Sequence, residues 1–288
     1  MRVFLHIGAP RTGTSSLQQL LHDNRTKLRS MGFHYPRVGY LDPKQGNAQH
    51  GLAFCLLETY PAFVDEKHRP PKDRIWPLLR EHLDSIDDDI ILSSEAFSSV
   101  TPESVKFILD FFKDDELEVI YIARDSDSWH KSMGKQQIKQ FPFKTNPPSG
   151  YKGNINFVEN KHLEHWRKNK ANLTVMTYSR DVSDRFLRHI GVDHEQLTPI
   201  ESLNSSLPDS VLELLMSLNG IQMPIHTRSH LNRNVETWWF NHSGDNAQDK
   251  SKDQIVEEFM TQIANVPLNE DVFNKVHETV KEWVAEQA

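Results

Sequence analysis

The sequence predicts an α/β fold of three layers, with a central parallel sheet and a helical C-terminal part. Short apolar runs of strand length recur through about the first 180 residues, and each is followed by a loop and a helical pattern. From residue 208 onward, the pattern of apolar residues is mostly helical. We therefore expect parallel strands at 3–7, 89–93, 118–123 and 173–178.

Length and composition limit the class of protein. The 288 residues are enough for one large domain, and we expect a single domain over residues 1–288. The formal net charge of −7 argues against a general nucleic-acid binder. Cys55 is the only cysteine, which excludes an intramolecular disulfide and a multi-cysteine zinc site. No run reaches the roughly 20 apolar residues of a membrane span, and without a secretory signal pattern we expect a cytoplasmic protein.

The first expected strand leads through the loop 8–13 into a helix expected from about Thr14 to Met31. The first turn of a helix carries unpaired N–H groups, and its dipole favours negative charge, so this junction predicts an anion site. Gly13 allows a ligand to approach the backbone closely, and Arg11 adds a positive charge. Hydroxyl donors come from Thr12, Thr14, Ser15 and Ser16.

Two other interpretations of this junction remain open. Gly8, Gly13 and Ser15 have the spacing of a nucleoside triphosphate loop, which favours a P-loop kinase or NTPase. Thr14, however, stands where such a loop needs a lysine for the β- and γ-phosphates. The simpler alternative is a helix capped by Thr12 or Thr14 after a glycine turn.

The loop resembles the 5′-phosphosulfate loop of the sulfotransferases, whose pattern is Pro-Lys-Ser-Gly-Thr-Thr. Here the pattern is Pro10-Arg11-Thr12-Gly13-Thr14-Ser15, with arginine in place of lysine. Arginine keeps the charge but presents it as a planar fork. The resemblance implies that the 5′-phosphosulfate is bound by Pro10, Arg11, Thr12, Gly13, Thr14, Ser15 and Ser16.

Two further strand ends carry candidate site residues. In open parallel sheets the ligand lies beyond the carboxyl ends of the strands, and Glu95 lies just past the strand 89–93. Arg124 follows the strand 118–123, and Ser132 comes eight residues later. The sulfotransferases have an arginine and a serine in this arrangement, which implies that Arg124 and Ser132 hold the 3′-phosphate. Where the family has Asn-Pro after the arginine, this chain has Asp125-Ser126, and the alternative is a surface Arg124 paired with an aspartate.

The three segments cover roughly the first 190 residues. Their combined resemblance to the sulfotransferases implies an enzyme that uses 3′-phosphoadenosine 5′-phosphosulfate (PAPS) without a metal, closer to the carbohydrate-type and bacterial members. Arg11 would stabilise the leaving phosphate, and Glu95 would be the general base that accepts the acceptor's proton. His50 is a second candidate base, whereas His6 is expected to be a buried core histidine. The alternatives are a P-loop kinase or NTPase-like protein and a non-catalytic binding protein with the same fold.

Several features bear on the partners. Lys131, Lys135 and Lys139 share one helical face, which is either a solvated face or a rim that attracts an anion. The polar loops 39–47, 61–71 and 141–153 favour a hydrophilic acceptor such as a carbohydrate. Arg228 and Arg233 stand in an expected polar connector, and assigning either to the 3′-phosphate is a guess. The aromatic cluster Trp238–Phe240 is either core or a contact site.

Overall fold

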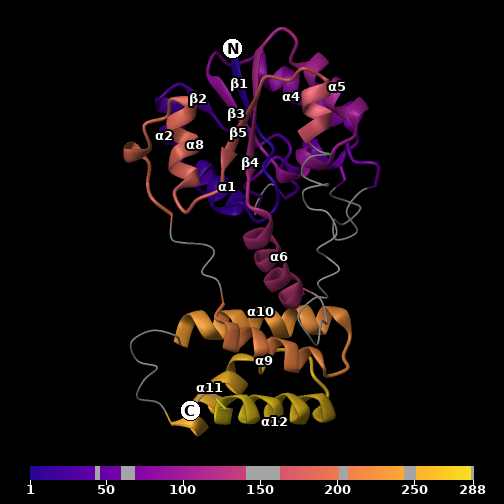
Figure 1. The fold of residues 1–288 in the computed structure, drawn as a ribbon, viewed down its shortest axis with the longest axis vertical. Coiled ribbons are helices and arrows are strands. Elements are labelled where there is room, and N and C mark those ends of the chain that lie inside the picture. The colour runs from indigo at the N-terminus through magenta and orange to yellow at the C-terminus, as the bar shows by residue number, and fades with distance from the viewer. Residues whose placement is uncertain (43–45, 60–68, 141–162, 201–206, 243–250, 287–288) are drawn as a thin grey trace. The chain divides into compact units, whose positions relative to one another are not determined.

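The structure is a computed structural model that describes residues 1–42, 46–59, 69–140, 163–200, 207–242 and 251–286. Its centre is a five-stranded sheet in the order β2-β3-β1-β4-β5, and every pairing is parallel (Figure 1). This confirms the predicted α/β fold with a parallel sheet. The strands are β1 (Arg2–His6), β2 (Phe33–His34), β3 (Asp89–Ser93), β4 (Glu116–Ala123) and β5 (Leu173–Thr177).

Helices cover both faces of the sheet. Alternate strand residues point to opposite faces, so Val3 and Leu5 enter one apolar core while Phe4 enters the other. The first core is covered by α3 (His50–Phe54), α4 (Lys72–Leu83), α5 (Pro102–Phe111) and a helical stretch over 163–168. The second is covered by α1 (Thr14–Asp23), α2 (Arg25–Ser30) and α8 (Val182–Ile190). The expected three-layer arrangement is therefore present around this sheet.

The first helix differs from its expected extent, because it ends at Asp23 and α2 begins at Arg25. The buried side chain of Asn24 lies at the break. Its amide donates to the Leu20 carbonyl and to the Thr198 carbonyl, 3.0 and 2.9 Å away, and its oxygen accepts the Thr198 N–H at 2.7 Å. An asparagine side chain that bonds to the backbone in this way competes with the helical hydrogen bonds.

The chain divides into two compact units. The sheet unit comprises residues 1–129 and 154–204, and the helical unit comprises residues 130–153 and 205–288. α6 (Ser126–Gln140) begins in the sheet unit and continues into the helical unit. The expectation of one domain over residues 1–288 stays a prediction. No helix in the described part of the chain is both long and apolar enough to span a membrane.

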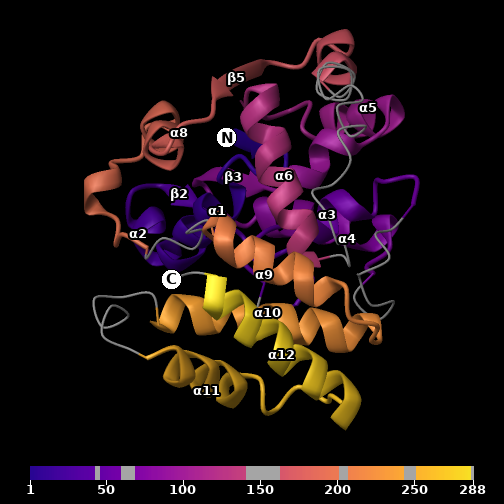
Figure 2. The same cartoon turned by 60° about the horizontal axis from the view of Figure 1, so that its bottom comes forward.

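The helical unit has a core of its own, in which Val211, Leu215, Val235, Phe259 and Val276 are fully buried. The helices that surround this core lie against one another in both views (Figures 1 and 2). They are α9 (Asp209–Asn219), α10 (Ile225–His242), α11 (Lys252–Gln262) and α12 (Glu270–Glu286). The helical C-terminal part is thus confirmed, but the expected connector around Arg228 and Arg233 is wrong, because both residues lie within α10.

Candidate active site at the carboxyl ends of the strands

The carboxyl ends of the strands meet at one edge of the sheet unit. His6 at the end of β1 is in register with Ser93 of β3 and with Ile120 of β4. The Ser94 N–H donates to the His6 carbonyl at 3.1 Å, so the residue before Glu95 is held against the end of β1. This edge therefore brings together the loop 8–13, Glu95 and Arg124, as the sequence predicted for a parallel sheet.

The loop 8–13 leaves the start of α1 without a side-chain cap. Gly13 is the N-cap residue and has a φ of 80°, which favours glycine. The predicted alternative, a cap from Thr12 or Thr14, is not formed, because the Thr12 hydroxyl donates to the Ala9 carbonyl at 2.6 Å. Backbone N–H groups at such a helix start are suited to hold an anion.

Arg11 has a left-handed backbone, with a φ of 67°, and Arg124 holds it from the side of β4. The Arg124 guanidinium donates through Nη1 to the Arg11 carbonyl at 2.8 Å and through Nε to Ser128 Oγ at 2.9 Å. Its Cζ lies 4.5 Å from the ring centroid of Tyr178, within the range of a cation–π contact. Arg124 thus packs against the loop and supports it. Within the described residues it forms no salt bridge.

Two residues near Arg124 add further hydrogen bonds at the start of α6. The Trp129 indole N–H donates to the Pro10 carbonyl at 2.9 Å, a second link between the start of α6 and the loop. Asp125 accepts the Ser128 N–H at 2.9 Å and also its hydroxyl. These bonds to Ser128 lower the pKa of Asp125, which keeps it ionised at the N-terminus of α6.

Glu95 begins the short 3-10 helix η2 (Glu95–Ser99), immediately beyond β3. Its carboxylate oxygen Oε2 accepts a hydrogen bond from Gln18 Nε2 of α1 at 3.0 Å. The Glu95 side chain is 28% exposed, so solvent reaches this carboxylate. A half-buried carboxylate at the ligand-facing edge of a sheet has access to an acceptor's proton.

His50 lies beside Glu95, although it is distant in sequence. Its Nδ1 is 2.8 Å from Ser94 Oγ and 4.0 Å from Glu95 Oε2, and its ring stacks on Phe54 with centroids 5.5 Å apart. The residue before it fixes this position: the buried Gln49 amide accepts the Ser93 N–H at 2.8 Å. The structure therefore brings both predicted candidate bases together.

His6 is fully buried beneath the loop, as expected of a core histidine. Its Nδ1 lies 2.8 Å from Ser93 Oγ, whereas its Nε2 has no hydrogen-bond partner in the described part of the chain. Burial lowers the pKa of His6 to about 4, so the imidazole is neutral near pH 7. A Cβ on Gly8 would lie 2.6 Å from His6 Nε2, which explains the glycine there.

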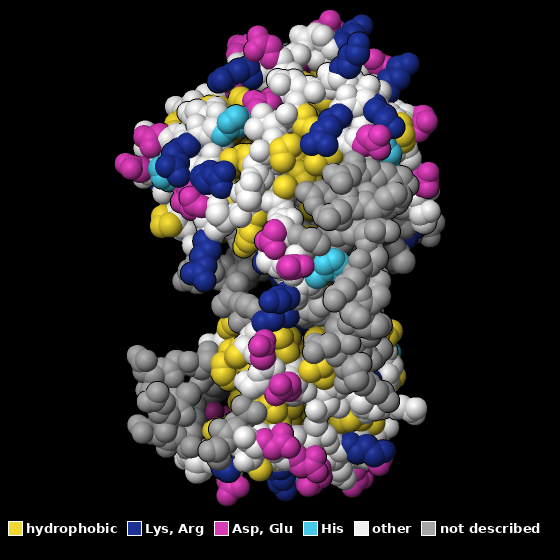
Figure 3. All heavy atoms as spheres, viewed as in Figure 1, with side chains coloured by type: hydrophobic (Ala, Val, Ile, Leu, Met, Phe, Trp, Pro, Cys, Tyr) yellow, Lys and Arg dark blue, Asp and Glu magenta, His cyan; other side chains and the backbone are white. Residues whose placement is uncertain are grey.

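Several predicted residues belong to the helical unit and not to the sheet unit that carries this edge. Ser132 lies on α6 in the helical unit, so its pairing with Arg124 stays a prediction. Lys135 and Lys139 form salt bridges of 2.9 and 3.0 Å with Asp209 and Glu236 of the same unit. These ion pairs weigh against an anion-attracting rim, and with Lys139 only 16% exposed the face is less solvated than the other alternative expected. Figure 3 likewise shows acidic and basic side chains interspersed over the visible face of that unit.

Arg228 is bonded within the helical unit. It is 4% exposed and donates to the carbonyls of Leu218 and Ile221 and to Asn219 Oδ1, at the end of α9. Trp238 is likewise buried in the core of the helical unit, whereas Phe240 is 43% exposed. The remaining predicted residues at 43–45, 61–68 and 141–162 lie outside the described residues.

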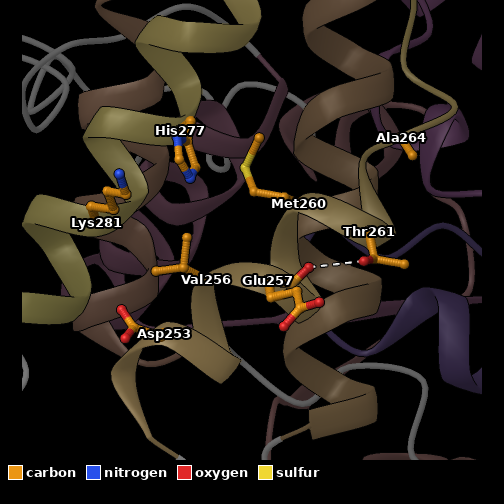
Figure 4. A pocket seen from close by; sticks show the side chains of 8 residues that line it. All are labelled: Asp253, Val256, Glu257, Met260, Thr261, Ala264, His277 and Lys281. Atoms are coloured by element: carbon orange, nitrogen blue, oxygen red, sulfur yellow. Dashed lines mark hydrogen bonds between the residues drawn. The ribbon is translucent and has the colours of Figure 1, made fainter.

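The helical unit also has a hollow of about 560 Å³ between α11 and α12 (Figure 4). Apolar Val256 and Met260 lie among charged side chains such as Glu257 and Lys281. None of the predicted site residues lines it, and no described group of three or more His, Cys, Asp or Glu side chains forms a metal site.

Some residues of the site were missed by the sequence interpretation, chiefly Gln18, Gln49 and Ser128. Gln18 gave one signal, because it follows Leu17 and lies about one turn before Leu21, on the apolar side of the expected helix. A polar side chain in such a position needs a buried partner. Gln49 and Ser128 gave none, because their partners are set by tertiary structure.

Comparison with protein-family models found no match, and comparisons with curated proteins and with solved structures found none either.

Proposed function

We propose that this protein is a sulfotransferase that moves a sulfuryl group from PAPS to a hydroxyl or amine of a hydrophilic acceptor, with a carbohydrate as the expected class. One observation carries the proposal: an arginine-bearing loop at an uncapped helix start and a half-buried carboxylate lie at the same edge of the sheet. The first group suits an anionic leaving group, and the second suits an acceptor that must lose a proton.

The donor end would be held by the loop and α1. Arg11 and the first turn of α1 would bind the 5′-phosphosulfate, with Gly13 leaving room for the ligand. As the bond from sulfur to the phosphate oxygen breaks, negative charge grows on that oxygen. Preorganised donors stabilise such charge without further rearrangement, which is the role proposed for Arg11.

The acceptor end would be served by Glu95. As the acceptor oxygen or nitrogen forms its bond to sulfur, its proton passes to the Glu95 carboxylate. His50 Nδ1, 4.0 Å from Glu95 Oε2, is close enough to stabilise or share that proton after a small movement. Since sulfuryl transfer involves less charge than phosphoryl transfer, arginine and backbone donors suffice for this chemistry.

A kinase or NTPase fits the loop less well. Thr14, at the position that would need the lysine, is buried. No other observation favours that reading over sulfuryl transfer. A nucleotide-binding protein without transfer activity is an outcome that the experiments below separate from the enzyme.

Nucleotide selectivity tests the donor site. Titration calorimetry with adenosine 3′,5′-bisphosphate should give tighter binding than ADP or ATP with Mg²⁺. Arg11→Ala should weaken bisphosphate binding by about tenfold to a hundredfold, the value of a charge-assisted hydrogen bond to phosphate. Arg167→Ala, which removes an exposed arginine on the helical stretch 163–168, should leave the affinity unchanged. Preference for ATP with Mg²⁺ would contradict the proposal.

Transfer of radioactive sulfate from PAPS to a panel of sugars, phenols and amines tests the chemistry. Glu95→Gln should lower kcat by about 10²- to 10⁴-fold, because the general base is lost, while bisphosphate affinity stays the same. Glu103→Gln, on the exposed first turn of α5, is the matched control. If the protein binds the bisphosphate but transfers sulfate to no acceptor, it is a binding protein.

A further inference from the structure

We infer that Gln18 is a positioning residue that fixes the Glu95 carboxylate relative to the donor loop; this inference rests on the proposed function. Gln18 lies on α1, the helix whose start forms the proposed donor site, and contacts the residue proposed as the base. One rigid helix thereby connects the two halves of the reaction.

The contacts of Gln18 use both hydrogens of its amide group. Nε2 is 3.0 Å from Glu95 Oε2 and 3.2 Å from Ser93 Oγ. Gln18 is 3% exposed, so losing either contact would leave a polar group without water to replace it. The amide is therefore held in one orientation, and it holds Oε2 of the carboxylate in turn.

The position of Gln18 on α1 sets its distance from the start of the helix. Gln18 comes four residues after Thr14, the first residue of the helix, so the two lie on the same face about 6 Å apart along the axis. A ligand bound at the helix start and a carboxylate held by Gln18 are consequently both positioned by the same helix. Such positioning of reacting groups accounts for much of the rate that enzymes gain.

The chemistry of the amide suits this role. A neutral amide orients a carboxylate without placing a full positive charge on it, which would make it a poorer proton acceptor. The titratable groups around Glu95 come from other elements: His50 from α3, His6 from β1 and Tyr35 after β2. Gln18 supplies the contact from α1, through Oε2 of the carboxylate.

Kinetics of Gln18→Met test the inference, because methionine has a similar shape but no hydrogen-bond donor. We expect kcat to fall between about tenfold and a hundredfold, with KM for PAPS and bisphosphate affinity unchanged. Gln196→Met is the matched control: this exposed glutamine of the sheet unit donates to Asp193 at 2.7 Å, and its replacement should leave kcat as in the wild type. Unchanged kcat in Gln18→Met overturns the inference, and so does a parallel loss of bisphosphate affinity, which would mark a structural role.

A measurement independent of turnover separates this inference from the proposed function. In ¹⁵N-labelled protein, the Gln18 side-chain amide signals are those that disappear in Gln18→Met. They should shift on acid titration in the wild type and lose that shift in Glu95→Gln. If the acid-induced shift of these signals is the same in Glu95→Gln as in the wild type, the inference is overturned. If the wild-type protein transfers no sulfate but its Gln18 signals shift as expected, only the proposed function is overturned.

Discussion

Arg124 of the sheet unit and Arg228 of the helical unit show how the same side chain is put to different uses. Arg124 follows a strand end, stays partly exposed and donates to the loop carbonyl of Arg11. Arg228 lies inside α10 and donates to carbonyl groups at the end of α9. Burial lowers the pKa of Arg228, yet it remains charged, as arginine does in proteins. A cation can serve a ligand only where the fold leaves part of it open, and here that place is the edge of the sheet.

The largest predicted effect on stability tests whether Arg228 has a structural role and Arg124 a binding role. Arg228→Ala should lower the free energy of unfolding by about 3 kcal/mol, because buried carbonyl groups at the end of α9 lose their donors. Bisphosphate affinity should not change. Arg124→Ala should instead weaken the bisphosphate about tenfold with a smaller loss of stability. Denaturant unfolding and calorimetry on both variants measure the two effects, and a reversed pattern would contradict the assignment.

The second prediction concerns acid stability, to which the fully buried His6 of the sheet unit should contribute. Its pKa of about 4 in the folded protein lies below the usual 6.5, so the unfolded chain binds more protons between these values. Stability should therefore fall as the pH drops from about 6.5 to about 4, by up to about 3 kcal/mol from His6 alone. The pKa of His34 is also lowered to about 4, mainly by burial and then by His82. His34 should therefore also lower the stability as the pH falls.

His6→Gln should flatten this pH dependence in thermal unfolding at a series of pH values. His226→Gln, on the exposed start of α10, should leave the slope as it is in the wild type. An unchanged slope in His6→Gln would mean that other groups cause the acid sensitivity.

The smallest predicted effect concerns the paired lysines of the helical unit. Lys135→Ala and Lys139→Ala should each cost less than about 1 kcal/mol of stability, with the larger loss for Lys139, whose side chain is only 16% exposed. Bisphosphate affinity should be the same in both variants at physiological salt. A tenfold loss of affinity at unchanged stability would revive the alternative of an anion-attracting rim.

The sequence predicted four of the five strands, because these are short apolar runs that stand out from the polar segments around them. The strand 89–93 was predicted with its observed bounds, and the edge carrying Glu95 and Arg124 followed from parallel topology. The break at Asn24 was missed, because the residue's partner is Thr198. The contacts of Gln18 with Glu95 and of Arg124 with Arg11 were missed for the same reason, since 77 and 113 positions separate the partners.

The left-handed backbone of Arg11 has a consequence for how ligands would be sensed. A non-glycine residue in that region carries a conformational cost of about 1 kcal/mol or more, and the Arg124 guanidinium helps to hold it there. A ligand that forms hydrogen bonds with Arg124 would compete with the Arg11 carbonyl for the same guanidinium. It would thereby weaken the contact that helps to hold the loop at Arg11. Fragments that engage only one of the two arginines would then influence each other's binding, so their affinities need not add up to that of the intact nucleotide.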